Sequence, residues 1–154
     1  MEKTKEKLIE AATNLGEGIG LNRAVCQIYA LLYLSDHPLS PTEIGKILGM
    51  SKGNVSINLR TLEQWDAVKK IWRKGYSRAL YTANENIEEI VLNKLKTGIE
   101  KRLKYIKPII SLAKENPSHS DENFSEKINQ IEKLLSKIEF FLSNFETIKS
   151  LITK

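Results

Sequence analysis

Apolar residues recur at steps of three and four through most of the chain, which predicts a mainly helical protein. Residues 4–15 place Leu8, Ala12 and Leu15 at helical spacing, and the glycine-rich run 16–20 then predicts a hinge between helices. A phosphate-binding loop would need a strand before it and a different glycine spacing. We therefore exclude a phosphate site at this run.

A second helix is predicted from about Asn22 to Ser35. Asn22 is a suitable N-cap, and Pro38 ends the helix because it pushes His37 out of helical geometry. One face of this helix is apolar and is expected to be buried: Leu21, Val25, Ile28 and Leu32.

Two further helices follow at close spacing. Ser40 and Glu43 form a capping box that predicts a short helix over 42–48, which Gly49 ends, and Ser51 caps the next helix, from 52 to about 65. Their inward positions are apolar: Ile44, Ile47, Leu48, Val55, Leu59 and Leu62. Two helices joined by a tight glycine-containing turn are typical of a helix-turn-helix.

A β-hairpin is predicted directly after these helices. Residues 68–72 alternate and are rich in β-forming residues, 74–77 read as a turn, and 79–82 read as the returning strand. Trp65 and Trp72 are expected to pack between helix and hairpin. The hairpin is the wing of a winged helix-turn-helix DNA-binding domain spanning residues 21–84.

Long helices are predicted for the rest of the chain. One runs over 87–115 and another over about 124–152, with a break at 116–120. The apolar stripe of the first comprises Leu92, Leu95, Ile99, Leu103, Ile106 and Ile110. That of the second comprises Ile131, Leu134, Ile138, Phe141, Phe145, Ile148 and Ile152, widened by Ile128, Leu135 and Leu142.

These stripes need a surface to cover them. An intrachain hairpin of the two helices and a second subunit about a two-fold axis are both expected, with the dimer favoured. The predicted fold class is thus mainly α with a small β-hairpin: a winged helix-turn-helix plus long helices forming a dimerisation region, residues 1–20 and 85–154.

The positive charge of the chain is concentrated in one segment. Net charge is +5, and residues 51–80 hold seven basic and two acidic side chains, so this segment accounts for the whole excess. A solvated basic surface would also produce such a cluster. On a helix-turn-helix and its wing, however, the cluster is what binding to a polyanion requires.

Catalytic and metal-binding patterns are absent from the sequence. His37, His119 and Cys26 form no ligand cluster at metal spacing, and Cys26 is expected to be a small packed or semi-exposed thiol. No apolar run approaches membrane-spanning length. We therefore expect a cytoplasmic protein with no cofactor and no membrane partner, which is not an enzyme.

The third predicted helix is the candidate recognition helix. Asn54 is suited to an adenine, Lys52 and Arg60 to guanine or phosphate, and Ser51 to a phosphate oxygen at the helix N-terminus. Ile57 is suited to a thymine methyl group or, alternatively, to packing beneath the wing. The predicted DNA-binding residues of this helix are Ser51, Lys52, Gly53, Asn54, Ser56, Ile57 and Arg60.

Four wing residues complete the candidate DNA site: Arg73, Lys74, Tyr76 and Arg78. Basic side chains at a glycine turn are placed to flank the DNA backbone or to enter a minor groove. Tyr76 is suited to stacking or hydrogen bonding there, although exposed turn tyrosines are often inert. The absence of an aromatic platform on a sheet argues against single-stranded RNA as the ligand.

Four runs together resemble the GbsR branch of MarR-type regulators: 16–23, 27–35, 38–44 and 51–60, the last being the most specific. The resemblance covers about residues 5–115. It implies an obligate homodimer joined by helices from both chain ends, a pseudo-palindromic operator in double-stranded DNA, and regulation by a small effector.

The chain departs from that family pattern at two places. Asp66 stands where many relatives have a glycine, and the wing tip lacks the acidic residue that many relatives place beside the arginine. The expected function is a sequence-specific transcriptional regulator, with repression as the default. The alternative is a winged helix that serves as a protein-interaction module in a larger transcription complex.

Overall fold

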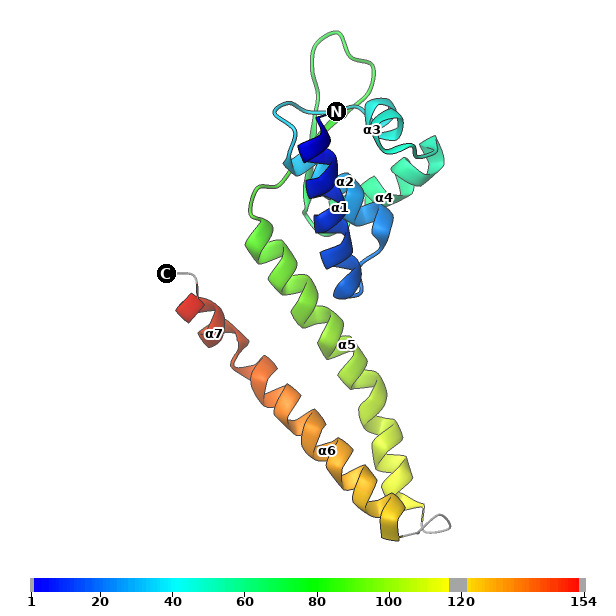
Figure 1. Cartoon of the computed structure of the whole chain (residues 1–154), viewed down its shortest axis with the longest axis vertical. Helices are drawn as coiled ribbons and strands as arrows, with labels where there is room; N and C mark the ends of the chain where they lie inside the picture. The colour runs from blue at the N-terminus through cyan, green and yellow to red at the C-terminus, as the bar shows by residue number, and fades with distance from the viewer. Residues whose placement is uncertain (1, 117–121, 153–154) are drawn as a thin grey trace. The chain divides into compact units, whose positions relative to one another are not determined.

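A computed structural model describes residues 2–116 and 122–152, and it divides into two compact units, Met1–Leu92 and Asn93–Lys154. The elements are labelled in Figure 1. They are α1 (Lys3–Gly18), α2 (Arg23–Tyr33), α3 (Pro41–Leu48), α4 (Lys52–Gln64), β1 (Val68–Ile71), β2 (Leu80–Ala83), α5 (Ile87–Glu115), α6 (Glu122–Ser143) and α7 (Phe145–Ile152). The fold is therefore mainly helical with one two-stranded hairpin, as the sequence predicted.

The glycine-rich run holds the predicted break between helices only at its end, at Ile19 and Gly20. Helix α1 continues through Gly16 and Gly18, and the chain turns at Gly20, which has a φ of 86°. A Cβ built on Gly16 would lie 2.3 Å from the Cys26 Sγ atom of α2. Gly16 thus allows α1 and α2 to approach closely, a contact between elements that local sequence does not reveal.

Helix α1 buries a different face from the one suggested by its leucines. Ile9 and Thr13 are buried against the core, and the Thr13 hydroxyl donates to the Ile9 carbonyl. Leu8 and Leu15 are 49% and 71% exposed. Helix α1 packs on α2 and belongs to the first unit. Its assignment to the dimerisation region stays a prediction.

The caps of the helix-turn-helix follow the sequence closely. The Asn22 side chain accepts from the first turn of α2, and Ser40 and Glu43 form the capping box of α3. Gly49 ends α3 in the left-handed conformation with a φ of 66°, and Ser51 caps α4. The placement of Ile47 inside the protein was wrong: it is 41% exposed, because α3 presents only its Ile44 side to α4 and α2.

The core of the first unit lies between α2, α3, α4 and the hairpin. Its most buried side chains are aliphatic: Ile28, Leu32, Ile44, Val55, Leu59 and Leu62. Strands β1 and β2 are antiparallel, with Val68 opposite Ala83 and Ile71 opposite Leu80. An isolated bridge joins Leu39 to Tyr81 and ties the loop before α3 to the hairpin. The core thus fixes both α4 and the base of the wing.

In the second unit, α5 and α6 run antiparallel. Lys114 pairs with Glu132, and Lys107 with Glu139, so residues later in α6 meet residues earlier in α5. The seam between them is apolar and holds Leu103, Ile110, Ile128, Leu135 and Leu142, buried or half-buried. Phe145, the first residue of α7, is buried as well. The pair of α5 and α6 is the intrachain hairpin that the sequence predicted beside a dimer.

The last helix is interrupted, contrary to the single helix predicted over 124–152. α6 ends at Ser143, and α7 begins at Phe145. The Asn144 side chain donates to the Phe140 carbonyl, a bond that competes with regular helical pairing. Ile131, Leu134 and Phe141 remain 39–56% exposed, because the seam uses the neighbouring Ile128, Leu135 and Leu142 instead.

Candidate nucleic-acid interface

Helix α4 presents a continuous polar face to solvent. Val55, Leu59 and Leu62 are at most 2% exposed and anchor the opposite side of the helix in the core. The predicted DNA-binding residues of this helix are all exposed: Ser51, Lys52, Gly53, Asn54, Ser56, Ile57 and Arg60. The fold therefore leaves the whole predicted face open to a ligand.

The first turn of α4 is organised by two side chains. The Ser51 hydroxyl oxygen accepts from the Asn54 backbone N–H at 3.2 Å, so its own hydrogen is free to donate to a phosphate. Asn58, which sequence reasoning missed, is 7% exposed and donates to the Asn54 side-chain oxygen at 2.6 Å. This bond orients the Asn54 amide, leaving its NH₂ group directed away from Asn58. The signal available in the sequence was an amide three residues after the buried Val55 and directly before the buried Leu59.

Two small or apolar residues on this face have no structural partner. A Cβ built on Gly53 would meet no atom within 4 Å, so the fold does not require glycine there. Ile57 is 63% exposed, which excludes the alternative that it packs beneath the wing. Both features suit a surface that another molecule approaches closely.

The wing tip is a tight turn one residue earlier than predicted. The Tyr76 N–H donates to the Arg73 carbonyl at 3.1 Å, and Gly75 has a φ of 91°. A positive φ at this third position is characteristic of a type II turn and favours glycine. Arg73, Lys74, Tyr76 and Arg78 are all exposed on the loop, which projects beyond the helices of the first unit in Figure 1.

The positive charge of α4 and the wing is almost entirely uncovered. Lys70 pairs with Glu63 of α4 at 2.8 Å, and the hydrogen bond to Glu63 raises the pKa of Lys70. The other basic residues of the segment have no acidic partner among the described residues: Lys52, Arg60, Lys69, Arg73, Lys74 and Arg78. One ion pair thus fixes the hairpin to α4, and six cations remain for an external anion.

The two tryptophans differ in environment. Trp65 is half-buried and packs against the core, as predicted. Trp72 was expected to pack in the same way, but it is 69% exposed. It follows the last paired residue of β1, where the hairpin has already left the core.

Two further side chains with potential chemistry, Cys26 and Tyr29, are buried or half-buried. Burial, with a smaller effect of Glu17, raises the pKa of the Cys26 thiol and makes it a poor nucleophile. Burial also raises the pKa of Tyr29 to about 12, and its hydroxyl donates to the Asn84 carbonyl at 2.8 Å.

Among the described residues, no three histidine, cysteine or acidic side chains gather as a metal site. None of the helices in the described ranges combines the length and apolarity that crossing a membrane requires.

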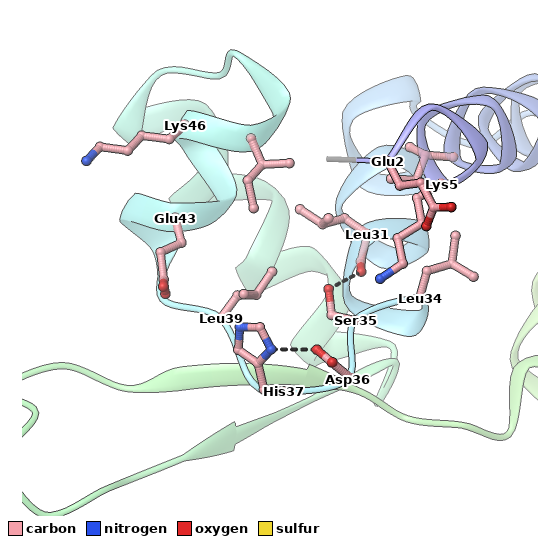
Figure 2. A pocket seen from close by; sticks show the side chains of 12 residues that line it. Glu2, Lys5, Leu31, Leu34, Ser35, Asp36, His37, Leu39, Glu43 and Lys46 are labelled. Carbon is pink, nitrogen blue, oxygen red and sulfur yellow. Dashed lines mark hydrogen bonds and ion pairs between the residues drawn. The ribbon is translucent and has the colours of Figure 1, made fainter.

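One cleft, of about 390 Å³, lies within the first unit between the start of α1, the α2–α3 loop and α3. Figure 2 shows its aliphatic side chains, such as Leu31 and Leu39, with polar groups around them. A hydrogen bond of 2.6 Å joins His37 Nδ1 to Asp36 Oδ1, and this hydrogen bond lowers the pKa of Asp36. The cleft could hold a small molecule with an apolar body and a polar group.

The family comparison covers α4 and β1 of this interface and stops before the wing tip. Residues 19–71 match the model of the MarR family. The chain is 24% identical over 86 residues to OpcR of Bacillus subtilis (strain 168), an HTH-type transcriptional repressor, covering 56% of this chain and 46% of OpcR. It is 23% identical over 86 residues to YvaV of the same strain, named as an HTH-type transcriptional regulator, covering 56% of this chain and 49% of YvaV. The chain thus spans about half the length of the curated relatives it matches.

A solved structure extends the likeness to the fold. The crystal structure of a transcriptional regulator matches with a TM-score of 0.62 at 17% identity, covering 96% of this chain and 99% of that one. The MarR part of the predicted resemblance is confirmed, whereas the GbsR branch stays a prediction. Residues 19–71 therefore match the MarR family over α2 to β1, and the fold of the whole chain is similar to that of a solved transcriptional regulator.

Proposed function

We propose that the protein is a sequence-specific regulator of transcription that binds double-stranded DNA through α4 and the wing, and that it acts as a repressor by occluding a promoter. The observation that carries this proposal is the set of six uncovered cations on α4 and the hairpin. DNA carries one phosphate charge about every 1.7 Å of helix axis, and such a surface meets it without first breaking internal ion pairs.

The alternative of a protein-interaction module is less well supported. Such a module has no need for unpaired cations on both the recognition helix and the wing. Here Lys52, Arg60 and Arg78 are exposed and have no acidic partner within the described chain. The exposed Ile57 and the open space at Gly53 also suit the close approach of base edges in a major groove.

A gel shift tests the proposal, with duplex fragments that include the promoter region of the protein's own gene. We expect retardation that weakens steeply with salt, and loss of retardation when Lys52, Arg60 and Arg78 are all changed to alanine. The matched control changes Lys101 and Lys104 of α5, also exposed and unpaired in the described structure, and should bind as the wild type does. Equal binding by the K52A/R60A/R78A variant would contradict the proposal.

We also propose a homodimer through the second unit. Helix α6 exposes Ile131, Leu134 and Phe141, and α5 exposes Tyr105, Ile109 and Leu112. At 100° per residue, each trio falls within an arc of about 80° that is distinct from the α5–α6 seam. Two apolar stripes left open after the hairpin has formed favour a second copy of the chain. A dimer would present two α4 helices to successive major grooves about 34 Å apart.

Sedimentation velocity at micromolar concentration tests the dimer. The double variant Leu134→Glu and Phe141→Glu places charge on the proposed interface and should sediment as a monomer. Asn129→Glu is the control, because residue 129 lies about 140° around α6 from residue 134 and should leave the dimer intact. A monomeric wild type under these conditions would end the dimer proposal.

We also propose a small-molecule effector, which a cleft beside α3 in the first unit supports. Its walls include α1 and α3, so an occupant would contact the first helix of the helix-turn-helix directly. A thermal-shift screen of small organic acids and amines tests this. Stabilisation that Leu39→Phe abolishes would support the site, and hits that this substitution leaves unchanged would place the effector elsewhere.

A further inference from the structure

Trp72 is the most exposed aromatic side chain of the first unit, and neither the fold nor the predicted recognition contacts use it. Its side chain is 69% exposed, and it has no hydrogen bond, ion pair or ring contact within the described chain. A tryptophan can bury about 200 Å², so leaving it in water forgoes a large hydrophobic stabilisation. Trp65, seven residues earlier, is packed against the core. The exposure of Trp72 is therefore a feature of the hairpin and not of tryptophan in this fold generally.

If the alternation of β1 continues by one residue, Trp72 lies on the side of the recognition helix. Val68 is buried against the core, and two residues later Lys70 reaches Glu63 of α4 at 2.8 Å. Successive side chains of a strand point to opposite faces, so every second residue shares a face. Trp72 is the next residue of this series, one position past the end of β1. It is thus expected between α4 and the wing tip.

The charges around Trp72 restrict what can cover it. Arg73 and Lys74 follow it directly, Lys69 precedes it on β1, and Arg78 lies on the same loop, all exposed and without an acidic partner in the described structure. A second copy of this face would carry the same positive charge and be repelled. An anionic surface is favoured, and the indole N–H, a donor with no acceptor function, suits a phosphate oxygen.

We propose that Trp72 is a DNA-positioning residue, with its ring packed on the deoxyribose of one strand and its Nε1–H donated to a phosphate between the α4 and wing contacts. This inference rests on the proposed DNA binding. Phosphate and sugar contacts fix the register of a protein on the duplex and carry no sequence information directly. Trp72 therefore strengthens binding to operator and non-operator duplexes alike, whereas Asn54 and Ile57 discriminate between them.

Titration of fluorescently labelled duplexes with the full-length protein tests this role. Trp72→Ala should weaken binding about tenfold, the effect of removing one hydrogen bond to a charged group. The loss should be equal for an operator-containing and a scrambled duplex, so that their affinity ratio stays constant. Trp72→Phe keeps the ring and should recover part of the loss. Phe140→Ala, which removes a 73% exposed aromatic of α6 outside the candidate DNA site, is the matched control and should not reproduce the loss.

Intrinsic fluorescence gives an independent readout. In a Trp65→Phe protein, Trp72 is the sole tryptophan, and saturating duplex should change its emission and protect it from iodide quenching, in a manner reversed by salt. Wild-type protein that binds no duplex would refute the regulator proposal and this inference together. Binding that is intact in Trp72→Ala would refute the Trp72 role alone, and so would a loss of affinity confined to the operator duplex.

Discussion

The contact between α1 and α2 gives a direct test of how the first unit is packed. Gly16 of α1 faces Cys26 of α2 so closely that an added Cβ would lie 2.3 Å from Sγ. The next atoms that this Cβ would meet are the Cys26 Cβ at 3.4 Å and the Leu21 Cδ1 at 3.8 Å, both ordinary contacts. A single sulfur atom therefore decides whether alanine fits at residue 16.

The magnitudes follow from that geometry. In the wild-type background, Gly16→Ala gains about 0.8–1 kcal/mol of helix propensity but adds an overpacking cost of about 1–3 kcal/mol. The net change should be a loss of stability of up to about 2 kcal/mol. In a Cys26→Ala background the sulfur is absent, so Gly16→Ala should stabilise the protein by up to about 1 kcal/mol. The coupling between the two substitutions should be about 1–3 kcal/mol.

Urea unfolding followed by circular dichroism measures this cycle, at one protein concentration because a dimer would make stability concentration-dependent. The four proteins are the wild type, the two single variants and the double variant. The prediction is a change of sign in the effect of Gly16→Ala when Cys26 is alanine. Additivity within about 0.5 kcal/mol would show that α1 and α2 are not packed as described.

Three further predictions concern the interface and its support. Gly53→Ala should raise stability by about 0.5–1 kcal/mol yet weaken duplex binding, because its methyl group faces the proposed DNA. Gly98→Ala in α5 is the control and should raise stability without changing binding. Unfolding and gel-shift measurements on both variants test this. Asp66→Gly should stabilise by up to about 1 kcal/mol in urea unfolding, because Asp66 adopts a φ of 55°, and destabilisation would contradict this explanation. Hydrogen bonds from Ser40 hold the pKa of Glu43 below its ordinary value of 4.5. The wild type should therefore be more stable in unfolding measurements than the Glu43→Gln variant above pH 4.5, and this advantage should shrink as pH falls through the lowered pKa. A stability advantage that grew in acid would refute this explanation.

Local signals in the sequence predicted the ends of the helices well. Asn22, Ser40, Gly49 and Ser51 act within a few residues of their own position, through hydrogen bonds to the nearest turn or through a left-handed backbone. Asp66, where the family resemblance implied a glycine, adopts the left-handed conformation with a φ of 55°. Such features depend little on distant parts of the chain, so the helix-turn-helix could be delimited without a structure.

The faces that the helices bury could not be predicted to the same degree. Leu8 and Leu15 are more apolar than Thr13, yet α1 buries Thr13, because Gly16 and Cys26 set the side on which α1 meets α2. Likewise α6 has two adjacent apolar stripes, and α5 covers only one of them. Where two faces of a helix are comparably apolar, the partner decides between them, and spacing along one helix contains no information about that partner.

The exposed residues of α4 were predictable because they are defined by the core and not by their own contacts. Once Val55, Leu59 and Leu62 are buried, helical geometry directs Gly53, Ile57 and the basic residues outward. For stability alone, a glycine with nothing against it and a 63% exposed isoleucine are poor choices in a helix. Both become favourable if another surface lies against them. That surface has to approach closely, offer apolar contact and carry negative charge, and the major groove of DNA meets all three conditions.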